Sequence, residues 1–390
     1  MHNFTTIKQQ YDDSILPTYG RQPVAFIEGT GSRLFDSSGK VYIDFASGIG
    51  VNSIGHSHPK WVEAVAQQAA MLSHTSNLFY TTPGGELSDK LCKLSGMKGV
   101  FFSNSGAEAN EGLIKTARKY SSDKYGKNRN TIITLNDSFH GRTITTLAAT
   151  GQDKFHNHFH PFTEGFRHVN AGDIKSLENQ EDDVCAVLIE TIQGEGGVNP
   201  LEKEYVEAIA DLCKKRDWLL LIDEVQTGIC RTGRWFGFQH FDIIPDGISF
   251  AKGVAGGLPL GGFMVNDKLS TVLTPGDHAS TYGGNLVCCA AAIAVIEVLA
   301  REFPKIEEKG QYIRQKIEAM KLPQVLEIRG KGLMLGLKLN VNPAEINAKL
   351  LQNGLVALTA GADVLRFLPP LTITTDEIDS GLKILESTLK

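Results

Sequence analysis

The sequence lacks the features of several protein classes. No run of about 18 apolar residues occurs among its 390 residues, so we expect no membrane-spanning helix. The first residues contain no apolar segment followed by a small-residue cleavage site, and we expect no secretory signal. Basic residues number 39 and acidic residues 44, which gives a net charge of −5. Nucleic-acid binding needs a clustered positive surplus, so this class is not expected.

Cysteine is scarce, and its spacing excludes the usual disulfide and zinc patterns. None of the six cysteines forms a CxxC pair, which is typical of reduced core residues and predicts a cytoplasmic protein. They are Cys92, Cys185, Cys213, Cys230, Cys288 and Cys289. The alternating His156, His158 and His160 are expected to form a loop or surface cluster, so no metal site is predicted.

Glycine, in contrast, is abundant, with 40 residues concentrated in a few loops. Between these loops, short apolar runs alternate with segments of helical periodicity, which favours a mostly parallel sheet buried on both faces. The helical segments run from Ala107 to about Tyr120 and over Glu202–Arg216. The strand-like runs are Gly99–Ser103, Thr131–Leu135, Cys185–Ile189, Trp218–Ile222, Ile248–Ala251 and Gly262–Val265.

The last third of the chain has a different pattern, which predicts a smaller α+β unit. Long helices are expected over about Leu286–Arg301 and after Pro304, and shorter strands and helices follow them. At this length two domains are expected. We predict a large domain over 51–275, a small α+β domain over 276–390, and an N-terminal segment, 1–50, that packs with the small domain.

The segment SNSGAEAN, residues 103–110, follows a strand-like run and opens a helix. Ser105 and Glu108 fit a capping box, and the free amides at a helix start bind anions. Gly106 would let an anion approach the backbone closely. Alone, this pattern favours an ordinary capped helix, because capping boxes are common.

Two further residues stand where strands are predicted to end. Asp223 follows an apolar run, and Lys252 enters a glycine-rich loop. Ligands of open α/β sheets bind at the carboxyl ends of the strands, and burial would lower the pKa of the lysine. The run before Asp223 also resembles the Walker B segment of ATPases. That alternative fails because no Gly-Lys pair stands in a P-loop frame.

An anion-binding helix start, a carboxylate and a buried lysine together suit pyridoxal 5'-phosphate (PLP). This cofactor needs a phosphate cradle, an acid beside its pyridine nitrogen and a lysine that binds it covalently. A non-catalytic protein that only binds PLP is an alternative, but it would not need the full set of residues.

Eight segments in register resemble the class III aminotransferases of PLP fold type I. They are residues 16–59, SNSGAEAN, FHGRT, IQGEGG, LIDEVQTGICRTG, AKGVAGGLPLGG, STYGGN and VLRFLPPLTIT. The resemblance covers nearly the whole chain. It implies a large domain with a mostly parallel, seven-stranded sheet, a smaller α+β domain and a homodimer with shared active sites.

The resemblance also implies the cofactor site. Lys252 would bind PLP and carry the proton, Asp223 would pair with the ring nitrogen, and Gln226 would approach the phenolic oxygen. Val225 and Phe139 would pack on the two faces of the ring.

At the phosphate end, Ser105, Gly106 and Ala107 would supply contacts, and Thr281 would reach the phosphate across the dimer interface, with Ser280 beside the substrate. The family more often has Thr where Ala107 stands, so one hydroxyl contact is absent.

The substrate carboxylates are assigned by the same resemblance to Arg142 and Arg366, whose planar guanidinium groups suit bidentate pairing. Glu195 would pair with Arg366 while the donor amine reacts and would move aside for 2-oxoglutarate. Its alternative role is that of a turn-forming acid in a glycine loop. The family often has Pro where Thr191 stands.

The family members that this sequence resembles most transfer the terminal amine of N-acetylornithine to 2-oxoglutarate, in arginine biosynthesis. Ornithine, N-succinylornithine and 4-aminobutyrate are the alternative donors, because the sequence does not locate the pocket walls that select the acyl group.

Overall fold

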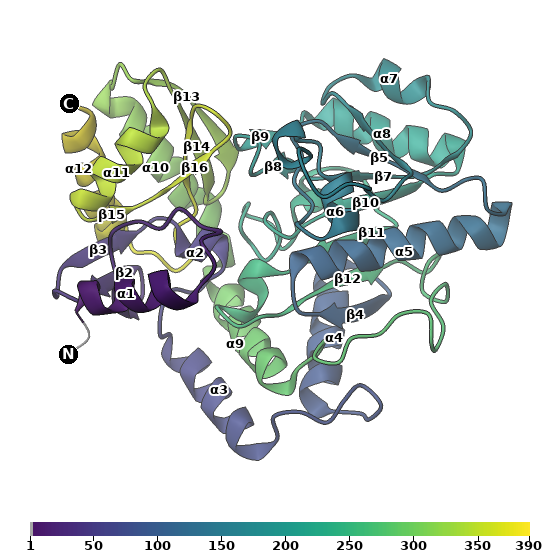
Figure 1. The fold of residues 1–390 in the computed structure, drawn as a ribbon, viewed down its shortest axis with the longest axis horizontal. Helices are drawn as coiled ribbons and strands as arrows, with labels where there is room; N and C mark the ends of the chain where they lie inside the picture. The colour runs from purple at the N-terminus through teal and green to yellow at the C-terminus, as the bar shows by residue number, and fades with distance from the viewer. Residues whose placement is uncertain (1–2) are drawn as a thin grey trace.

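The computed structural model describes residues 3–390. Over these residues the strands form a seven-stranded central sheet, a four-stranded N-terminal sheet, a four-stranded C-terminal sheet and a two-stranded ribbon. The ribbon consists of β8 (Ile192–Gln193) and β9 (Asn199–Pro200). Figure 1 shows the central sheet at one side of the molecule and the two smaller sheets at the other.

The central sheet has the order β4-β12-β11-β10-β7-β5-β6. Five neighbouring strands, from β11 to β6, run parallel, and β12 is antiparallel to both of its neighbours. The strands are β4 (Gly99–Ser103), β5 (Thr131–Leu135), β6 (Phe166–Val169), β7 (Val184–Ile189), β10 (Leu219–Asp223), β11 (Gly247–Phe250) and β12 (Gly261–Val265). Every residue of β5, β7, β10, β11 and β12 is buried, which explains their continuous apolar sequences. The predicted mostly parallel α/β sheet is confirmed.

Helices cover the central sheet. The 20-residue helix α5 (Gly106–Tyr125) packs against β11 and β12, and α8 (Lys203–Arg216) packs against β10. In α5, Gly112 leaves room for Phe263, because a Cβ atom there would lie 2.2 Å from the Phe263 ring. The shorter helices near this sheet are α6 (Ile144–Ala149), α7 (Ile174–Glu178), η1 (Asp153–Phe155), η2 (Gly237–His240) and η3 (Lys252–Ala255).

A second group of helices lies below the central sheet in Figure 1. Helix α9 (Leu286–Glu302) packs against both α3 (Pro59–Met71) and α4 (Thr82–Ser95). Its Cys288 and Cys289 are buried and free, as expected for core residues. Helices α3 and α4 were not predicted from the sequence.

The C-terminal sheet has the order β13-β14-β17-β16 and is covered by helices. Its strands are β13 (Val325–Lys331), β14 (Met334–Leu339), β16 (Leu358–Ala360) and β17 (Val364–Phe367). The helices are η4 (Phe303–Lys305), α10 (Ile306–Met320), α11 (Pro343–Gln352) and α12 (Thr375–Leu389). Helix α12 begins with a capping box between Thr374 and Glu377.

The N-terminal sheet joins the two ends of the chain. Strands β1 (Phe26–Thr30), β2 (Arg33–Asp36) and β3 (Val41–Asp44) form an antiparallel meander, and β15 (Leu355–Val356) pairs with β3 in parallel. Figure 1 shows these purple strands beside the yellow C-terminal elements. Helices α1 (Phe4–Ser14) and α2 (Ser47–Gly50) flank them. The domain boundaries at 50 and 275 stay predictions.

Two features that the sequence analysis discounted are now placed. Nε2 of His156 lies 2.8 Å from the carbonyl oxygen of Leu147, and within residues 3–390 no group of three or more metal-ligating side chains occurs. Over the same residues, no helix is long and apolar enough to cross a lipid bilayer.

Candidate active site

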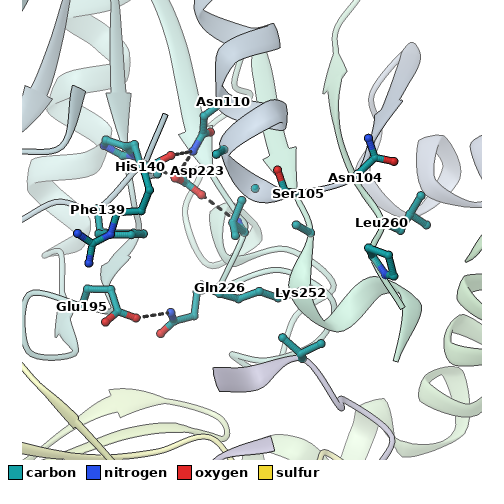
Figure 2. Close-up of a pocket in the computed structure, with 18 of the residues that line it drawn as sticks. Asn104, Ser105, Asn110, Phe139, His140, Glu195, Asp223, Gln226, Lys252 and Leu260 are labelled. Atoms are coloured by element: carbon teal, nitrogen blue, oxygen red, sulfur yellow. Dashed lines mark hydrogen bonds and ion pairs between the residues drawn. The ribbon is translucent and has the colours of Figure 1, made fainter. Parts of the chain in front are cut away.

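A cavity of about 450 Å³ opens where the strands of the central sheet end. Asp223 is the last residue of β10, and Lys252 follows β11 closely. Figure 2 shows both side chains at the wall of this cavity. Ten of the residues predicted from the sequence line it: Ser105, Gly106, Ala107, Phe139, Arg142, Glu195, Asp223, Val225, Gln226 and Lys252. Segments far apart in the sequence therefore meet at one site.

The start of helix α5 forms one end of the cavity. The Ser105 hydroxyl accepts the Glu108 amide at 3.2 Å, and the Glu108 carboxylate accepts the Asn104 amide at 2.7 Å. The return bond of the predicted capping box thus goes to Asn104 rather than to Ser105. The amides of Gly106 and Ala107 have no hydrogen-bond partner in the part of the chain that the structure describes. They are free to bind an anion at the positive end of the helix.

Gly106 is also required sterically. A Cβ atom at this position would lie 2.7 Å from the Cγ1 atom of Val225. Only glycine therefore lets the start of α5 and the segment after β10 approach this closely.

Asp223 is buried and surrounded by donors. Its Oδ2 atom accepts from Nδ2 of Asn110 at 2.7 Å and lies 2.8 Å from Nδ1 of His140. Its Oδ1 atom accepts the amide of Val225 at 3.0 Å and the hydroxyl of Ser249 at 3.3 Å. Burial alone would raise the pKa of Asp223, but the hydrogen bond and the charge of His140 and the other donors lower it. The carboxylate is therefore held in its charged form.

Lys252 faces the cavity from the first residue of η3, with a left-handed φ of 42°. Desolvation lowers the pKa of Lys252, which favours the neutral, nucleophilic amine, while the negative charge of Glu195 opposes this shift. Within residues 3–390 its amine has no hydrogen-bond partner, so the nitrogen is available to a ligand. A left-handed conformation is uncommon for a residue with a side chain and is often found at functional sites.

Arg366 lies in β17 and reaches toward the cavity from the C-terminal sheet. Its Nη1 atom is 2.6 Å from Oε1 of Glu195, and it also donates to the side-chain oxygen of Gln226 at 3.2 Å. Nε2 of Gln226 donates to the same Glu195 oxygen at 3.4 Å, a contact drawn as a dashed line in Figure 2. Burial alone would raise the pKa of Glu195, but the charge and hydrogen bond of Arg366 outweigh it and lower the pKa.

Arg142, the second predicted arginine, is exposed at the cavity wall. Its guanidinium carbon lies 4.0 Å from the ring centroid of Phe155 and 5.4 Å from that of Phe139. This stacking holds the guanidinium group in place. Within residues 3–390, Arg142 has no carboxylate partner, whereas Arg366 is paired with Glu195.

Besides Arg366, which contacts the cavity wall at Glu195 and Gln226, two predicted site residues do not line the cavity. Thr281 is exposed, and Ser280 accepts hydrogen bonds from Gly283 and from the Asn104 side chain at 3.3 Å. The structure of one chain does not bring Thr281 to the other site residues. A contact across a dimer interface stays a prediction.

The sequence analysis missed three buried residues of the site, Asn110, His140 and Glu190. Glu190 accepts the amides of Phe139 at 3.0 Å and Gly194 at 3.3 Å, and burial raises its pKa. It comes directly after β7, so the argument from strand ends that identified Asp223 could have found it. Asn110 and His140 stood in the quoted motifs, but only their contacts with Asp223 show their role.

Comparison with known proteins identifies the family of this fold and site. The sequence matches the family model described as "Aminotransferase class-III" over residues 17–389. The chain belongs to the class III aminotransferases. This family uses PLP, and the chain is a PLP-dependent aminotransferase.

Relatives within this family are similar over almost their full length. An acetylornithine aminotransferase of Haemophilus ducreyi is 49% identical, with 98% of each chain covered. The crystal structure of an acetylornithine aminotransferase from Elizabethkingia anophelis has a TM-score of 0.89 at 33% identity, covering 100% of this chain and 99% of that one. An ornithine aminotransferase structure from Toxoplasma gondii has a TM-score of 0.95 at 31% identity, covering 100% and 95%. The sequence relative and both solved structures are aminotransferases, and both structures share the fold of this chain.

The residues of the cavity fit the cofactor of this family. The unpaired amides at the start of α5 suit its phosphate, the charged Asp223 suits its protonated ring nitrogen, and the amine of Lys252 suits its carbonyl group. The tight packing of Gly106 against Val225 keeps the backbone close enough for the phosphate contact.

Proposed function

We propose that this aminotransferase transfers the terminal amine of N-acetylornithine to 2-oxoglutarate. The products are N-acetylglutamate semialdehyde and glutamate, and the pathway is arginine biosynthesis. The acetylornithine aminotransferases at 41–49% identity support this donor.

The observation that carries the proposal is the pairing of Glu195 with Arg366 beside a free Arg142. The donor has one carboxylate, and 2-oxoglutarate has two. With Arg366 paired, the site offers Arg142 alone, which suits the donor. When Glu195 turns away, both arginines are available to the two carboxylates of 2-oxoglutarate. The Nε atom of Arg366, which is buried without a partner in residues 3–390, is a further donor for this second carboxylate.

PLP, when bound, supplies an electrophilic carbonyl group and an electron-withdrawing ring for the transfer of the amine. We assign its phosphate to the amides of Gly106 and Ala107 together with the Ser105 hydroxyl, and its ring to the space between Val225 and Phe139. Asp223 would hold the proton of the ring nitrogen, because its carboxylate stays charged. Gln226, which contacts both Glu195 and Arg366, would bind the phenolic oxygen.

Lys252 moves the proton in this scheme. Its lowered pKa keeps a fraction of the amine neutral, and a neutral amine can remove a proton from the substrate carbon and return it elsewhere. The negative charge of Glu195 raises the pKa of this amine and the positive charge of Arg366 lowers it, and the charges of Asp223 and Glu190 raise it further.

We also propose that the protein is a homodimer in the cytoplasm. A groove of about 820 Å³ is lined by apolar and polar side chains from α3, α4, α9 and the loop between α3 and α4. In that loop Leu78, Phe79 and Tyr80 are 87%, 68% and 107% exposed. Asn77 Nδ2 donates to the carbonyl oxygens of Ser280 at 3.0 Å and Gly283 at 2.8 Å, so Thr281 belongs to the same surface. A second copy on this surface would cover the apolar residues and receive Thr281 at its own phosphate site.

The donor is tested by half-reactions of the purified holoenzyme. N-Acetylornithine, N-succinylornithine, ornithine and 4-aminobutyrate are added separately without a keto acid, and the loss of the visible cofactor band is followed. We expect the fastest loss with N-acetylornithine. Faster loss with another amine would contradict the proposed donor but keep the aminotransferase chemistry.

A further inference from the structure

Arg231 is a buried cation that the proposed reaction does not use. It lies between β10 and η2, and only 3% of the residue is exposed. In the described part of the chain no carboxylate lies within ion-pair distance of its guanidinium group. Burial lowers the pKa of Arg231 to about 9. The negative charge of Asp44 opposes this shift from beyond ion-pair distance. A buried charge without a direct ion pair is destabilising, so the contacts that Arg231 makes call for an explanation.

Those contacts all go to backbone atoms of the C-terminal part of the chain. The Nη1 atom of Arg231 donates to the carbonyl oxygens of Leu333 at 2.9 Å and Pro369 at 2.6 Å. The amide of Leu333 donates in turn to the carbonyl oxygen of Arg231 at 3.0 Å. The side chain and the backbone of Arg231 therefore both form a hydrogen bond with the backbone of Leu333.

The two carbonyl groups mark the end of the strand pair that carries Arg366. Strands β14 and β17 are antiparallel, with Leu335 opposite Phe367 and Gly336 opposite Arg366. Leu333 and Pro369 lie two residues beyond the Leu335–Phe367 pair, one on each chain segment. Pro369 has no amide hydrogen to offer to its neighbour. Arg231 supplies a donor where the ladder of hydrogen bonds cannot continue.

The segment before Arg231 has an unfavourable backbone conformation. Ile229 and Cys230 have φ values of 56° and 65°, which are rare for residues other than glycine and rarest for β-branched ones such as isoleucine. Gly332, on the opposite side of the contact, has a φ of 54°, and a Cβ atom there would lie 2.5 Å from the carbonyl carbon of Thr232. The left-handed residues before Arg231 and at Gly332 thus allow the two backbone segments to pack closely against each other.

We propose that Arg231 is a positioning residue for Arg366. By fixing the end of the β14–β17 pair against the segment that follows Asp223, it sets the place of the Arg366 guanidinium group in the cavity. Because Arg366 binds a carboxylate only in the 2-oxoglutarate step of the proposed function, on which this inference rests, that step depends on Arg231 more than the donor step does.

The test compares the two half-reactions in Arg231→Lys and Gly332→Ala holoenzymes. The first variant keeps the charge but not the paired donors, and the second displaces Leu333 from an intact Arg231. In both variants we expect the second-order rate constant for the reaction with 2-oxoglutarate to fall roughly tenfold or more. Small misplacements of a binding group have effects of this size. The donor step should change less than about threefold.

Gly96→Ala is the matched control for the glycine variant. Gly96 also has a left-handed φ, 74°, but no atom lies within 4 Å of a Cβ placed there. The Gly96→Ala variant should leave the ratio of the two half-reaction rates unchanged. Equal loss in both steps of Arg231→Lys and Gly332→Ala, or no loss in either, would overturn the inference. If Arg231→Lys does not fold, Gly332→Ala decides.

The same experiment keeps the two proposals apart. Wild-type enzyme that reacts with ornithine and not with N-acetylornithine contradicts the proposed donor. The ratio of the two steps is then measured with ornithine, and it still supports or overturns the role of Arg231.

Discussion

At the residue scale, charged side chains of both signs surround the amine of Lys252. The negatively charged Glu195 and the positively charged Arg366 lie near Lys252. Asp223 accepts hydrogen bonds from His140 and from uncharged donors. Desolvation is the largest influence on the pKa of Lys252, Glu195 and Asp223. The neighbours then decide which group is charged.

Replacing Lys252 tests its assignment directly. Lys252→Ala should lose transamination by at least about a thousandfold, since both the covalent attachment of the cofactor and the proton carrier are removed. The visible cofactor band and its half-reaction with N-acetylornithine are the measurements. Lys214→Ala, in the last turn of α8, is the control and should behave like wild type. Full turnover in the Lys252 variant would refute the assignment.

Replacing Glu195 tests the pairing with Arg366. Glu195→Gln keeps the size of the side chain and removes its charge, so Arg366 becomes available to a second carboxylate at all times. We expect glutamate to gain roughly tenfold as a donor relative to N-acetylornithine, the equivalent of about 1.4 kcal/mol. Competing half-reactions measure the ratio. The exposed Glu181→Gln is the control, and an unchanged ratio in Glu195→Gln would count against the pairing as a selector.

At the element scale, close packing of helix α5 on the central sheet orients the phosphate end of the site. Gly112→Ala places a methyl group 2.2 Å from the Phe263 ring, so the helix or the ring must move. We expect a loss of about 1–3 kcal/mol in unfolding free energy, measured by denaturant titration of the holoenzyme. Ser122→Ala, exposed in the same helix, should change it by less than about 0.5 kcal/mol. Equal stability of the two variants would show that the contact relaxes freely.

The strands of the central sheet that could be predicted from the sequence are those marked by continuous apolar runs. Strands β4 and β5 have the predicted bounds for this reason. Helix α3 was missed, and it has no buried residue in this chain. Its half-buried Trp61, Ala64 and Val65 nevertheless share one face at helical spacing, so a local signal for this helix was present in the sequence.

The candidate site was predictable to a similar extent. Lys252, Asp223 and Gly106 each stand where a strand ends or a helix begins, and local sequence indicates such places. His140 and Asn110 act through Asp223, from segments distant in the sequence, so no local pattern reveals them. Arg231 was within a quoted motif, yet only the position of Pro369 gives it a role.

At the scale of the whole molecule, the exposed apolar loop between α3 and α4 is the feature that one chain leaves unexplained. Leu78→Asp should convert the proposed dimer to monomers, because a carboxylate would be buried at the interface without a partner. Analytical ultracentrifugation measures the mass, and cofactor release by dialysis should accelerate if Thr281 acts across the interface. Ile244→Asp is the control, since Ile244 is 84% exposed elsewhere on the chain. A Leu78→Asp variant that remains dimeric would exclude this surface.

The parallel pairing of β3 with β15 has a consequence for the order of folding. The two strands are separated by roughly 300 residues, so the N-terminal sheet lacks its last strand for most of the time that a ribosome needs to make the chain. The amide of Phe45 donates to the carbonyl oxygen of Val356, so this hydrogen bond also cannot form until the later segment has been synthesised. A nascent chain stalled before residue 355 therefore has an unpaired strand edge in its N-terminal sheet. Unpaired strand edges promote aggregation and are bound by chaperones.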